Sequence, residues 1–380
     1  MEWLLWFSIA TIIYVYAGYP VLLLLMQKLG RSKPVQKREV EPTVALVISA
    51  YNEEDVIAGK LDNSLALDYP QDKLQIVVIS DCSEDRTDEI VTSYEAENVR
   101  LFRLQDRGGK TVGLNQVVPQ LDAEIVIFSD ANAMYDKGVV RKVVQNFADA
   151  GVGVVTGESR YAIDEGDSST ENENLYWRYE LALKKMESGL GSLVGGDGAI
   201  YSIRRSLYRP MKASDLSDFV NPLQIVSMGY RNIYEAEAFS YEKGGESFDK
   251  EFRRKVRIVN RAWRGMMTMR RLLNPFRFGF FAVQAWSHKL LRWLVPVFMI
   301  LAFASNVLLL GTSSFYNGLL VLQTAFYLLA IVGRMQQGRD NTPALFYIPY
   351  YFSLVNFASL KGIIENYTGH TYTVWNTVRQ

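Results

Sequence analysis

The chain has 380 residues, and its 41 basic and 41 acidic side chains cancel to a formal net charge of +0. This length fits one large domain or two, and the balanced charge gives no sign of a nucleic-acid-binding surface. The single cysteine, Cys82, excludes an internal disulfide and a multi-cysteine zinc site. The two histidines, His288 and His370, are too few and too far apart for a histidine metal cluster, so we expect both to be packed or interfacial.

The N-terminal segment, residues 1–28, carries no charged residue between Glu2 and Lys28. At about 1.5 Å per helical residue it is long enough to cross a hydrocarbon core of about 30 Å. A cleavable signal peptide is the alternative, but such a peptide has a basic start and a shorter apolar core. We therefore expect an uncleaved transmembrane anchor.

Five basic residues follow this anchor: Lys28, Arg31, Lys33, Lys37 and Arg38. Cytoplasmic flanks of membrane helices are enriched in Lys and Arg. The pattern therefore predicts that the next part of the chain lies in the cytosol and that the N-terminus lies outside.

The central block, residues 42–257, alternates strand and helix patterns. Short apolar runs predict strands at residues 44–49, 74–80, 99–104, 125–129 and 153–156, and helical patterns lie between them, as at 53–65 and 84–97. Alternation of this kind predicts an α/β domain in which crossover helices connect parallel strands.

The C-terminal part is again membrane-like. Residues 258–287 mix arginines with large apolar side chains, which predicts amphipathic helices in the membrane interface. Residues 288–364 contain apolar stretches at 290–310 and 319–332 and a more polar third candidate at 343–364, which predict transmembrane helices. Residues 365–380 form a tail.

Two glycine-containing segments superficially resemble nucleotide-binding motifs. Residues 151–157 precede a predicted strand, whereas a dinucleotide-binding loop follows one, and Gly108-Gly-Lys110 lacks the spacing of a phosphate loop. The absence of both contexts disfavours an oxidoreductase and an NTPase.

Polar loops follow three of the predicted strands, at residues 50–55, 81–86 and 130–132. One such loop alone is best explained by helix capping, because Asp, Asn and Ser favour caps and turns. The ends of parallel strands meet at one edge of a sheet, and ligands bind there in open α/β folds. Three such loops therefore predict a shared ligand.

Six motifs carry a family resemblance: VISAYNEE, VISDCSEDRTDEI, GGKTVGLNQ, FSDANAMY, GGDGAIYSIRR and LSDFVNPLQIVSMGYR. In this order they resemble membrane-bound family-2 glycosyltransferases over about residues 42–263, most of all the cellulose, chitin and hyaluronan synthase group. The resemblance implies a GT-A fold, with a mixed, mainly parallel sheet, helices on both faces and flanking transmembrane helices.

The resemblance also implies an activity and a location. We expect inverting transfer of a sugar from a nucleotide sugar, a UDP-sugar in the first instance, to a polysaccharide or lipid-linked acceptor in exopolysaccharide or cell-envelope glycan synthesis. The cofactor would be Mg²⁺ or Mn²⁺. The protein would lie in the bacterial inner membrane, with its catalytic domain in the cytosol.

The resemblance assigns donor-binding roles residue by residue. Tyr51, Asn52 and Glu53 would line the base-binding end of the site, Asp81 would hydrogen-bond the nucleoside, and Lys110 would approach the diphosphate.

Asp130 matches the first acid of the family's Asp-x-Asp motif, and Asn132 stands at the second position. A departing diphosphate calls for a hard cation with oxygen ligands. We therefore expect one carboxylate, Asp130, and an amide or water at Asn132 to hold the metal.

The acceptor side and the base follow from later motifs. Gly196 and Asp197 lie where the family shapes the acceptor pocket, although a simple turn explains the glycines equally well. Asp218 matches the acid of the family's Glu-Asp motif, here preceded by Ser217, and would be the catalytic base. A helix cap is the competing role for Asp218, and Asp215 is the second candidate base.

Arg254 and Arg257 would bind substrate, in the place where processive synthases carry Gln-x-x-Arg-Trp. The Gln and Trp are replaced by Arg254 and Ile258, which favours short additions over continuous polymerisation. The few predicted spans fit either a homo-oligomer or a lipid-linked or exported acceptor.

Two other classes are weaker. A catalytically inactive membrane regulator that binds nucleotide sugars need not keep Asp130 and Asp218 together. A transporter would place ionisable residues inside its spans, and these spans carry almost none.

Overall fold

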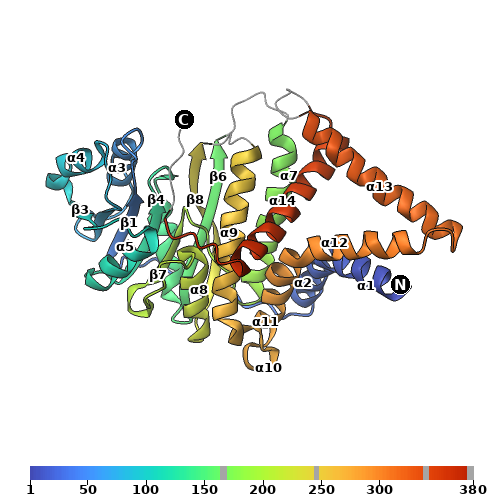
Figure 1. Cartoon of the computed structure of the whole chain (residues 1–380). Helices are drawn as coiled ribbons and strands as arrows, with labels where there is room; N and C mark the ends of the chain where they lie inside the picture. The colour runs from blue at the N-terminus through green and yellow to red at the C-terminus, as the bar shows by residue number, and fades with distance from the viewer. Residues whose placement is uncertain (163–168, 244–247, 337–341, 375–380) are drawn as a thin grey trace.

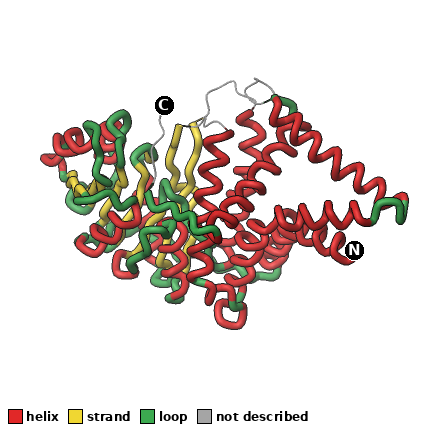
Figure 2. Tube along the Cα trace, viewed as in Figure 1, coloured by secondary structure: helices red, strands yellow, loops and turns green. Residues whose placement is uncertain are grey.

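The computed structural model describes residues 1–162, 169–243, 248–336 and 342–374. The sheet lies in one α/β domain, and long helices project away from that domain (Figure 1). Figure 2 shows that all strands belong to the α/β domain and that the projecting part is helical.

The sheet has eight strands in the order β3-β2-β1-β4-β7-β6-β8-β5. Their bounds are β1 Val44–Ala50, β2 Leu74–Ser80, β3 Val99–Arg103, β4 Ile125–Asp130, β5 Met134–Tyr135, β6 Val152–Ala162, β7 Tyr201–Arg204 and β8 Arg231–Lys243. Strands β3, β2, β1 and β4 are parallel to one another, and β7 is antiparallel to both of its neighbours. The sheet is therefore mixed and mainly parallel, as expected.

Helices cover both faces of the sheet. Strand β1 shows why: its residues are all buried and alternate between two core clusters, with Ala45 and Val47 in one and Leu46 and Ile48 in the other. The first cluster includes side chains of α5 (Lys110–Val117), α8 (Ser217–Ser227) and α9 (Phe248–Thr268), and the second includes side chains of α3 (Ile57–Leu65), α4 (Thr87–Ser93) and α6 (Val139–Val144).

The predicted strands all form, and the additional strands β5, β7 and β8 were not predicted from the sequence. The predicted helix at 53–65 begins only at Ile57, and the one at 84–97 is split into α4 and a 3₁₀ turn, Glu95–Glu97. Further 3₁₀ turns are Val118–Gln120, Gln145–Ala148, Arg205–Leu207 and Arg270–Leu273, and a long helix, α7, spans Ser169–Leu190.

Within the residues that the structure describes, three helical segments are long and apolar enough to cross a membrane: Glu2–Lys28, Phe280–Leu308 and Ser314–Met335. The first comprises α1 (Glu2–Ile13), a π-helical turn (Tyr14–Gly18) and α2 (Tyr19–Lys28). The second comprises α11 (Phe280–Gln284), a π-helical segment η7 (Ala285–Leu290) and α12 (Leu291–Leu308), and the third is α13. Trp3, 90% exposed in the isolated chain, illustrates the apolar surface that these segments present.

The third predicted C-terminal span corresponds to α14 (Ala344–Tyr367), which is not one of these three segments. Helix α14 lies along α9, where Asn260 donates a hydrogen bond to the Gly362 carbonyl (3.2 Å) and a Cβ at Gly362 would come within 2.7 Å of the Val256 carbonyl. Close backbone approach at Gly362 thus fixes α14 to the α/β domain.

The predicted interfacial segment continues α9 and then forms the short helix α10 (Pro275–Phe278). Phe276 is 99% exposed next to Arg277. This pairing of an exposed ring with a basic residue fits a location at a membrane surface.

Buried polar contacts join the membrane part to the α/β domain. Tyr19 of α2 donates a hydrogen bond to Glu187 of α7, and His288 contacts both Glu187 (2.8 Å) and Glu180 (3.3 Å). His288 is therefore a buried, packed residue, as expected, whereas His370 is exposed.

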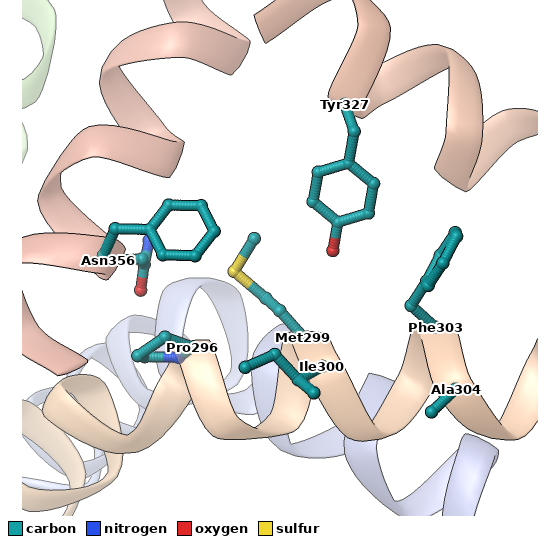
Figure 3. Close-up of a pocket in the computed structure, with 8 residues that line it drawn as sticks. Pro296, Met299, Ile300, Phe303, Ala304, Tyr327 and Asn356 are labelled. Carbon is teal, nitrogen blue, oxygen red and sulfur yellow. The ribbon is translucent and has the colours of Figure 1, made fainter. Parts of the chain in front are cut away.

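An apolar pocket of about 190 Å³ lies among α12, α13 and α14 (Figure 3). Its lining residues are Pro296, Met299, Ile300, Phe303, Ala304, Tyr327, Asn356 and Phe357. The pocket belongs to the membrane-like helices and takes no part in the polar site described below.

Candidate active site

The ends of three parallel strands bring the predicted polar loops together. In the register of the sheet, Ala50 pairs with Ser80, and Ser49 pairs with Asp130. The loops that begin at Tyr51 and Asp81 therefore lie beside Asp130 at one edge of the sheet, as the sequence predicted.

The first loop is joined to the second by hydrogen bonds. Asn52, whose φ of 51° is in the left-handed region, accepts a hydrogen bond from the Glu84 amide (2.8 Å). Glu53 is buried, and its amide donates to the Thr87 hydroxyl (2.8 Å). Asn52 and Glu53 thus shape the loop in the structure, and their contact with a base stays a prediction.

Tyr51 offers the flat surface at this end of the site. The Arg107 guanidinium lies over its ring, 3.7 Å from the centroid. The Tyr51 side chain is buried, so a nucleobase would have to take the place of the Arg107 guanidinium to stack on this face.

Asp81 holds the glycine turn that opens α5. Its buried carboxylate accepts hydrogen bonds from the amides of Gly108 (2.8 Å) and Gly109 (2.9 Å). Gly109 has a φ of 84°, which favours glycine, and it places Lys110 at the first position of α5.

Lys110 joins the glycine turn at the start of α5 to the Asp-x-Asn motif. Its Nζ lies 2.5 Å from Asp130 Oδ1 and 3.3 Å from the Gly198 carbonyl. The side chain of Asp130 is 38% exposed, so this carboxylate remains accessible to a ligand.

Gly198 lies between the two acids that the sequence singled out. A Cβ at this position would be 3.2 Å from Asp218 Oδ2 and 3.7 Å from Asp130 Oδ2. The missing side chain therefore leaves room between the carboxylates of Asp130 and Asp218, where reacting groups could lie.

The environment of Asp218 suits a base better than a cap. Burial raises the pKa of its carboxyl, the positive charge of Lys110 lowers it and the negative charge of Asp130 raises it, with a net upward shift. The N-cap of α8 is Leu216, and the helix start has no side-chain cap hydrogen bond. The structure therefore gives no support to the capping role.

Asp215 is engaged elsewhere. It is buried, its Oδ2 accepts a hydrogen bond from the Lys212 amide (2.9 Å), and its carbonyl accepts from Thr111 (2.9 Å) and from Arg261. These contacts hold its own loop, which favours Asp218 as the base.

The loop of Gly196 and Asp197 is fixed by hydrogen bonds. The Gly196 amide donates to the Asp218 carbonyl (2.7 Å), and the Asp197 carboxylate contacts Ser159 (2.5 Å) and Lys184 (3.1 Å). Asp197 thus connects β6 and α7 to this loop, next to the space where an acceptor would enter.

Arg254 and Arg257 lie on one face of α9. Arg254 pairs with Glu251 (2.6 Å). The pKa of Glu242 is raised to about 7, by burial first and then by the negative charges of Asp130 and Asp197, whereas the positive charge of Arg254 acts to lower it. The fold therefore brings Arg254 of α9 near Glu242 of β8, a neighbour that the sequence did not indicate.

Three residues near the site were missed by the sequence analysis: Lys60 on α3, Glu242 on β8 and Arg261 on α9. None lies in a quoted motif. The sequence offered a signal only for Lys60, which is a charged residue at a position where the helical spacing calls for an apolar side chain.

The donor set fits a divalent cation only in part. Asp130 supplies an accessible carboxylate, and Asn132 adds an amide next to it. Among the described residues, no group of three or more His, Cys, Asp or Glu side chains could hold a metal ion. A cation here would need further oxygen ligands from outside the protein, such as phosphate oxygens.

The C-terminal tail crosses the catalytic domain beside this site. The His370 carbonyl accepts hydrogen bonds from Asn260 (3.3 Å) and Arg264 (3.1 Å), and the Thr373 carbonyl lies where a Cβ of Gly109 would be. Residue 374, the last one described, is therefore on the same side of the molecule as the catalytic domain (Figure 1).

Comparisons with known proteins agree with this geometry. Residues 45–210 match the family model described as glycosyl transferase family 2. The chain is 34% identical over 119 residues to poly-beta-1,6-N-acetyl-D-glucosamine synthase of Staphylococcus aureus, covering 31% of this chain and 28% of the relative. It is 30% identical over 156 residues to beta-monoglucosyldiacylglycerol synthase of Trichormus variabilis, covering 40% of this chain and 33% of the relative.

A solved structure shares the fold over nearly the whole chain. It is a mannosyltransferase from Pyrobaculum calidifontis in complex with GDP-Man and Mn²⁺, with a TM-score of 0.72, 21% identity, and coverage of 96% of this chain and 99% of that one. The expected GT-A fold is thereby confirmed. Residues 45–210 therefore resemble family-2 glycosyltransferases in sequence, within a chain of GT-A fold.

Proposed function

We propose that this protein is a metal-dependent, inverting membrane glycosyltransferase. It transfers a sugar from a nucleotide sugar, with UDP-sugars as the first candidates, to a polysaccharide or lipid-linked acceptor in exopolysaccharide or cell-envelope glycan synthesis. The observation that carries the proposal is the placement of Asp130 and Asp218 on either side of Gly198, with Lys110 in contact with Asp130.

The donor would lie along the carboxyl ends of β1, β2 and β4. The Tyr51 ring supports the base, with Asn52 and Glu53 shaping its loop, and the loop fixed by Asp81 brings Lys110 to the diphosphate. Asp130 and Asn132 would hold the Mg²⁺ or Mn²⁺, which neutralises charge on the departing nucleoside diphosphate.

Asp218 would act as the base. Inversion is a direct displacement in which the acceptor hydroxyl attacks the anomeric carbon from the face opposite the leaving group. The Asp218 carboxylate takes the proton of that hydroxyl, which is worth about 10²–10⁴-fold in rate. Gly196 and Asp197 border the acceptor, and Arg254 and Arg257 would approach it or the diphosphate from α9.

The contacts of the tail refine the proposed topology. With the N-terminus outside, the candidate spans Glu2–Lys28, Phe280–Leu308 and Ser314–Met335 return the chain to the side of the catalytic domain, where the tail contacts Gly109. We propose that this side is the cytosol of a bacterial cell, where nucleotide sugars are made. A reporter fused after Arg38 that reads as exported would contradict this topology.

The direct test measures UDP and GDP release from a panel of UDP- and GDP-sugars by the purified protein, with and without a chelator. Release that depends on both the acceptor and a divalent cation is expected. Cation-dependent nucleotide binding without any release would instead support the inactive regulator, and the sizes of products made with excess donor test the expectation of short additions.

A further inference from the structure

Helix α3 carries a lysine that is completely enclosed. Lys60 is 0% exposed and is among the largest fully buried side chains of the described chain. Lysine is almost never fully buried unless its ammonium group is paired, because removing the charge from water is costly. Lys60 forms no salt bridge with any residue that the structure describes. The groups that its ammonium does contact must therefore offset the cost of removing the charge from water.

Both partners of Lys60 lie in the segment that directly follows the Asp-x-Asn motif. Its Nζ donates a hydrogen bond to the Ala133 carbonyl and lies 3.7 Å from the centroid of the Tyr135 ring. The Ala133 amide in turn donates to the Asp130 carbonyl (3.3 Å), which closes the turn that contains Asn132. Lys60 is thus connected to the proposed metal loop through one residue.

Asn63 makes a second connection one helical turn later. Its amide nitrogen donates to the Tyr135 carbonyl (2.9 Å), and its amide oxygen accepts from the Tyr135 amide (2.7 Å). Two side chains of α3 therefore hold residues 133–135 by hydrogen bonds to their backbone.

The charge of Lys60 also faces the site. Burial lowers the pKa of its ammonium group to about 7, and the carboxylates of Asp130 and Glu242 act in the opposite direction. A nearby anion is thus what favours the charged form of Lys60.

We propose that Lys60 is a positioning residue for the divalent cation: by fixing the Ala133 carbonyl it sets the turn that presents Asp130 and Asn132, without touching the donor itself. The proposal rests on the proposed function, because it requires a cation held at Asp130. This positioning by Lys60 matters more in this chain than in one with two acids in the motif, because Asp130 is the single carboxylate of the loop.

The test compares Lys60→Met with Lys60→Gln in the full-length protein. Methionine keeps an unbranched chain but cannot donate a hydrogen bond, whereas glutamine keeps an N–H donor without the charge. Mn²⁺ affinity in the presence of UDP, and in parallel of GDP, is measured from the free Mn²⁺ signal in electron paramagnetic resonance. Nucleotide binding with a chelator and the thermal unfolding midpoint are measured on the same samples.

Lys60→Met is expected to weaken Mn²⁺ binding by about 10–100-fold, the usual cost of losing a residue that orients a metal ligand. Metal-free nucleotide binding should stay at the wild-type level, and Lys60→Gln should bind Mn²⁺ more tightly than Lys60→Met. The matched control is Ser64→Ala, on the same helix, because the buried Ser64 hydroxyl contacts only the Lys60 carbonyl (2.7 Å) among described residues. That control should keep wild-type Mn²⁺ affinity.

Wild-type Mn²⁺ affinity in Lys60→Met, equal losses in Lys60→Gln and Lys60→Met, or a parallel loss of metal-free nucleotide binding would each overturn the proposal. Should Lys60→Met fail to fold, Asn63→Ala releases the same segment, and unchanged Mn²⁺ affinity in that variant would count against it. If wild-type protein itself shows no cation-dependent nucleotide binding, the proposed function fails, and this outcome is distinct from a failure of Lys60 alone.

Discussion

The proposed donor side and the proposed acceptor side of the site hold their acids in different ways. On the donor side, Asp81 accepts hydrogen bonds from two backbone amides, and Asp85 accepts from the amides of Thr87 (3.0 Å) and Glu54 (3.1 Å). On the acceptor side, no described residue donates a hydrogen bond to the carboxylate of Asp218, and burial raises the pKa of that carboxyl.

This difference distinguishes the acids that shape the loops of the site from the acid that is available for proton transfer. A carboxylate whose oxygens accept hydrogen bonds from backbone amides fixes a loop, and its oxygens are occupied by those amides. A buried carboxylate without such bonds has a pKa closer to neutrality, which suits proton transfer. Asp130 lies between the two groups, because it contacts Lys110 and is still accessible.

The largest effect is expected for Asp130→Ala. This change removes the single carboxylate of the Asp-x-Asn motif, so sugar transfer should be abolished and cation-dependent nucleotide binding should weaken. Transfer assays and nucleotide binding with and without a chelator measure both effects. Full activity of the variant in saturating Mn²⁺ and Mg²⁺ would contradict the metal assignment.

The next effect is expected for Asp218→Asn, which preserves shape but cannot accept a proton. The variant should fold and bind donor nucleotide normally and should lose transfer by at least about a hundredfold. The matched control is Asp215→Asn, because an amide oxygen can still accept the hydrogen bond from Lys212, and we expect near-normal turnover. Reversal of the two results would move the base to Asp215.

A smaller effect is expected for Asp81→Ala. The amides of Gly108 and Gly109 lose their acceptor, a loss of about 1–3 kcal/mol for buried donors, so the KM for donor should rise by about tenfold while kcat changes less. Steady-state kinetics with varied donor check this. Asp68→Ala, which removes an exposed carboxylate that pairs with Arg141, is the control and should leave the KM for donor nearly unchanged. Equal effects of the two changes would argue against a special role for Asp81.

The smallest effect is a shift to higher pH of the acidic limb in the pH profile of kcat/KM. The base must be deprotonated, so kcat/KM should fall as the pH drops through the pKa of Asp218, which lies above the ordinary Asp value of 3.8. The residual rate of Asp218→Asn should lack this limb. Glu242→Gln should retain it, although the pKa of Glu242 is raised to about 7, and loss of the limb in that variant would assign it to Glu242 instead.

The sequence by itself determined the parts that depend on local pattern. Apolar runs at β1, β2 and β4 specify buried parallel strands, and the polar residues that follow them had to meet at one sheet edge because parallel strands share their carboxyl ends. The same holds for the long apolar segment Glu2–Lys28, because the length of an apolar run relative to the thickness of a bilayer is a local property. The sequence placed the second span at residues 290–310, whereas the structure begins its helical segment at Phe280.

The tertiary structure alone decided which of the candidate side chains shape the loops and which remain available. Asp81 and Asp218 are both acids in family motifs, and only the contacts of Gly108, Gly109 and Gly198, distant in the chain, distinguish them. In the sequence Lys60 likewise looks like a residue of an ordinary helix, and only the fold brings the Ala133 carbonyl to its ammonium group. The physical reason is that pKa and ligand geometry depend on burial and on neighbours contributed by other elements, which no local pattern encodes.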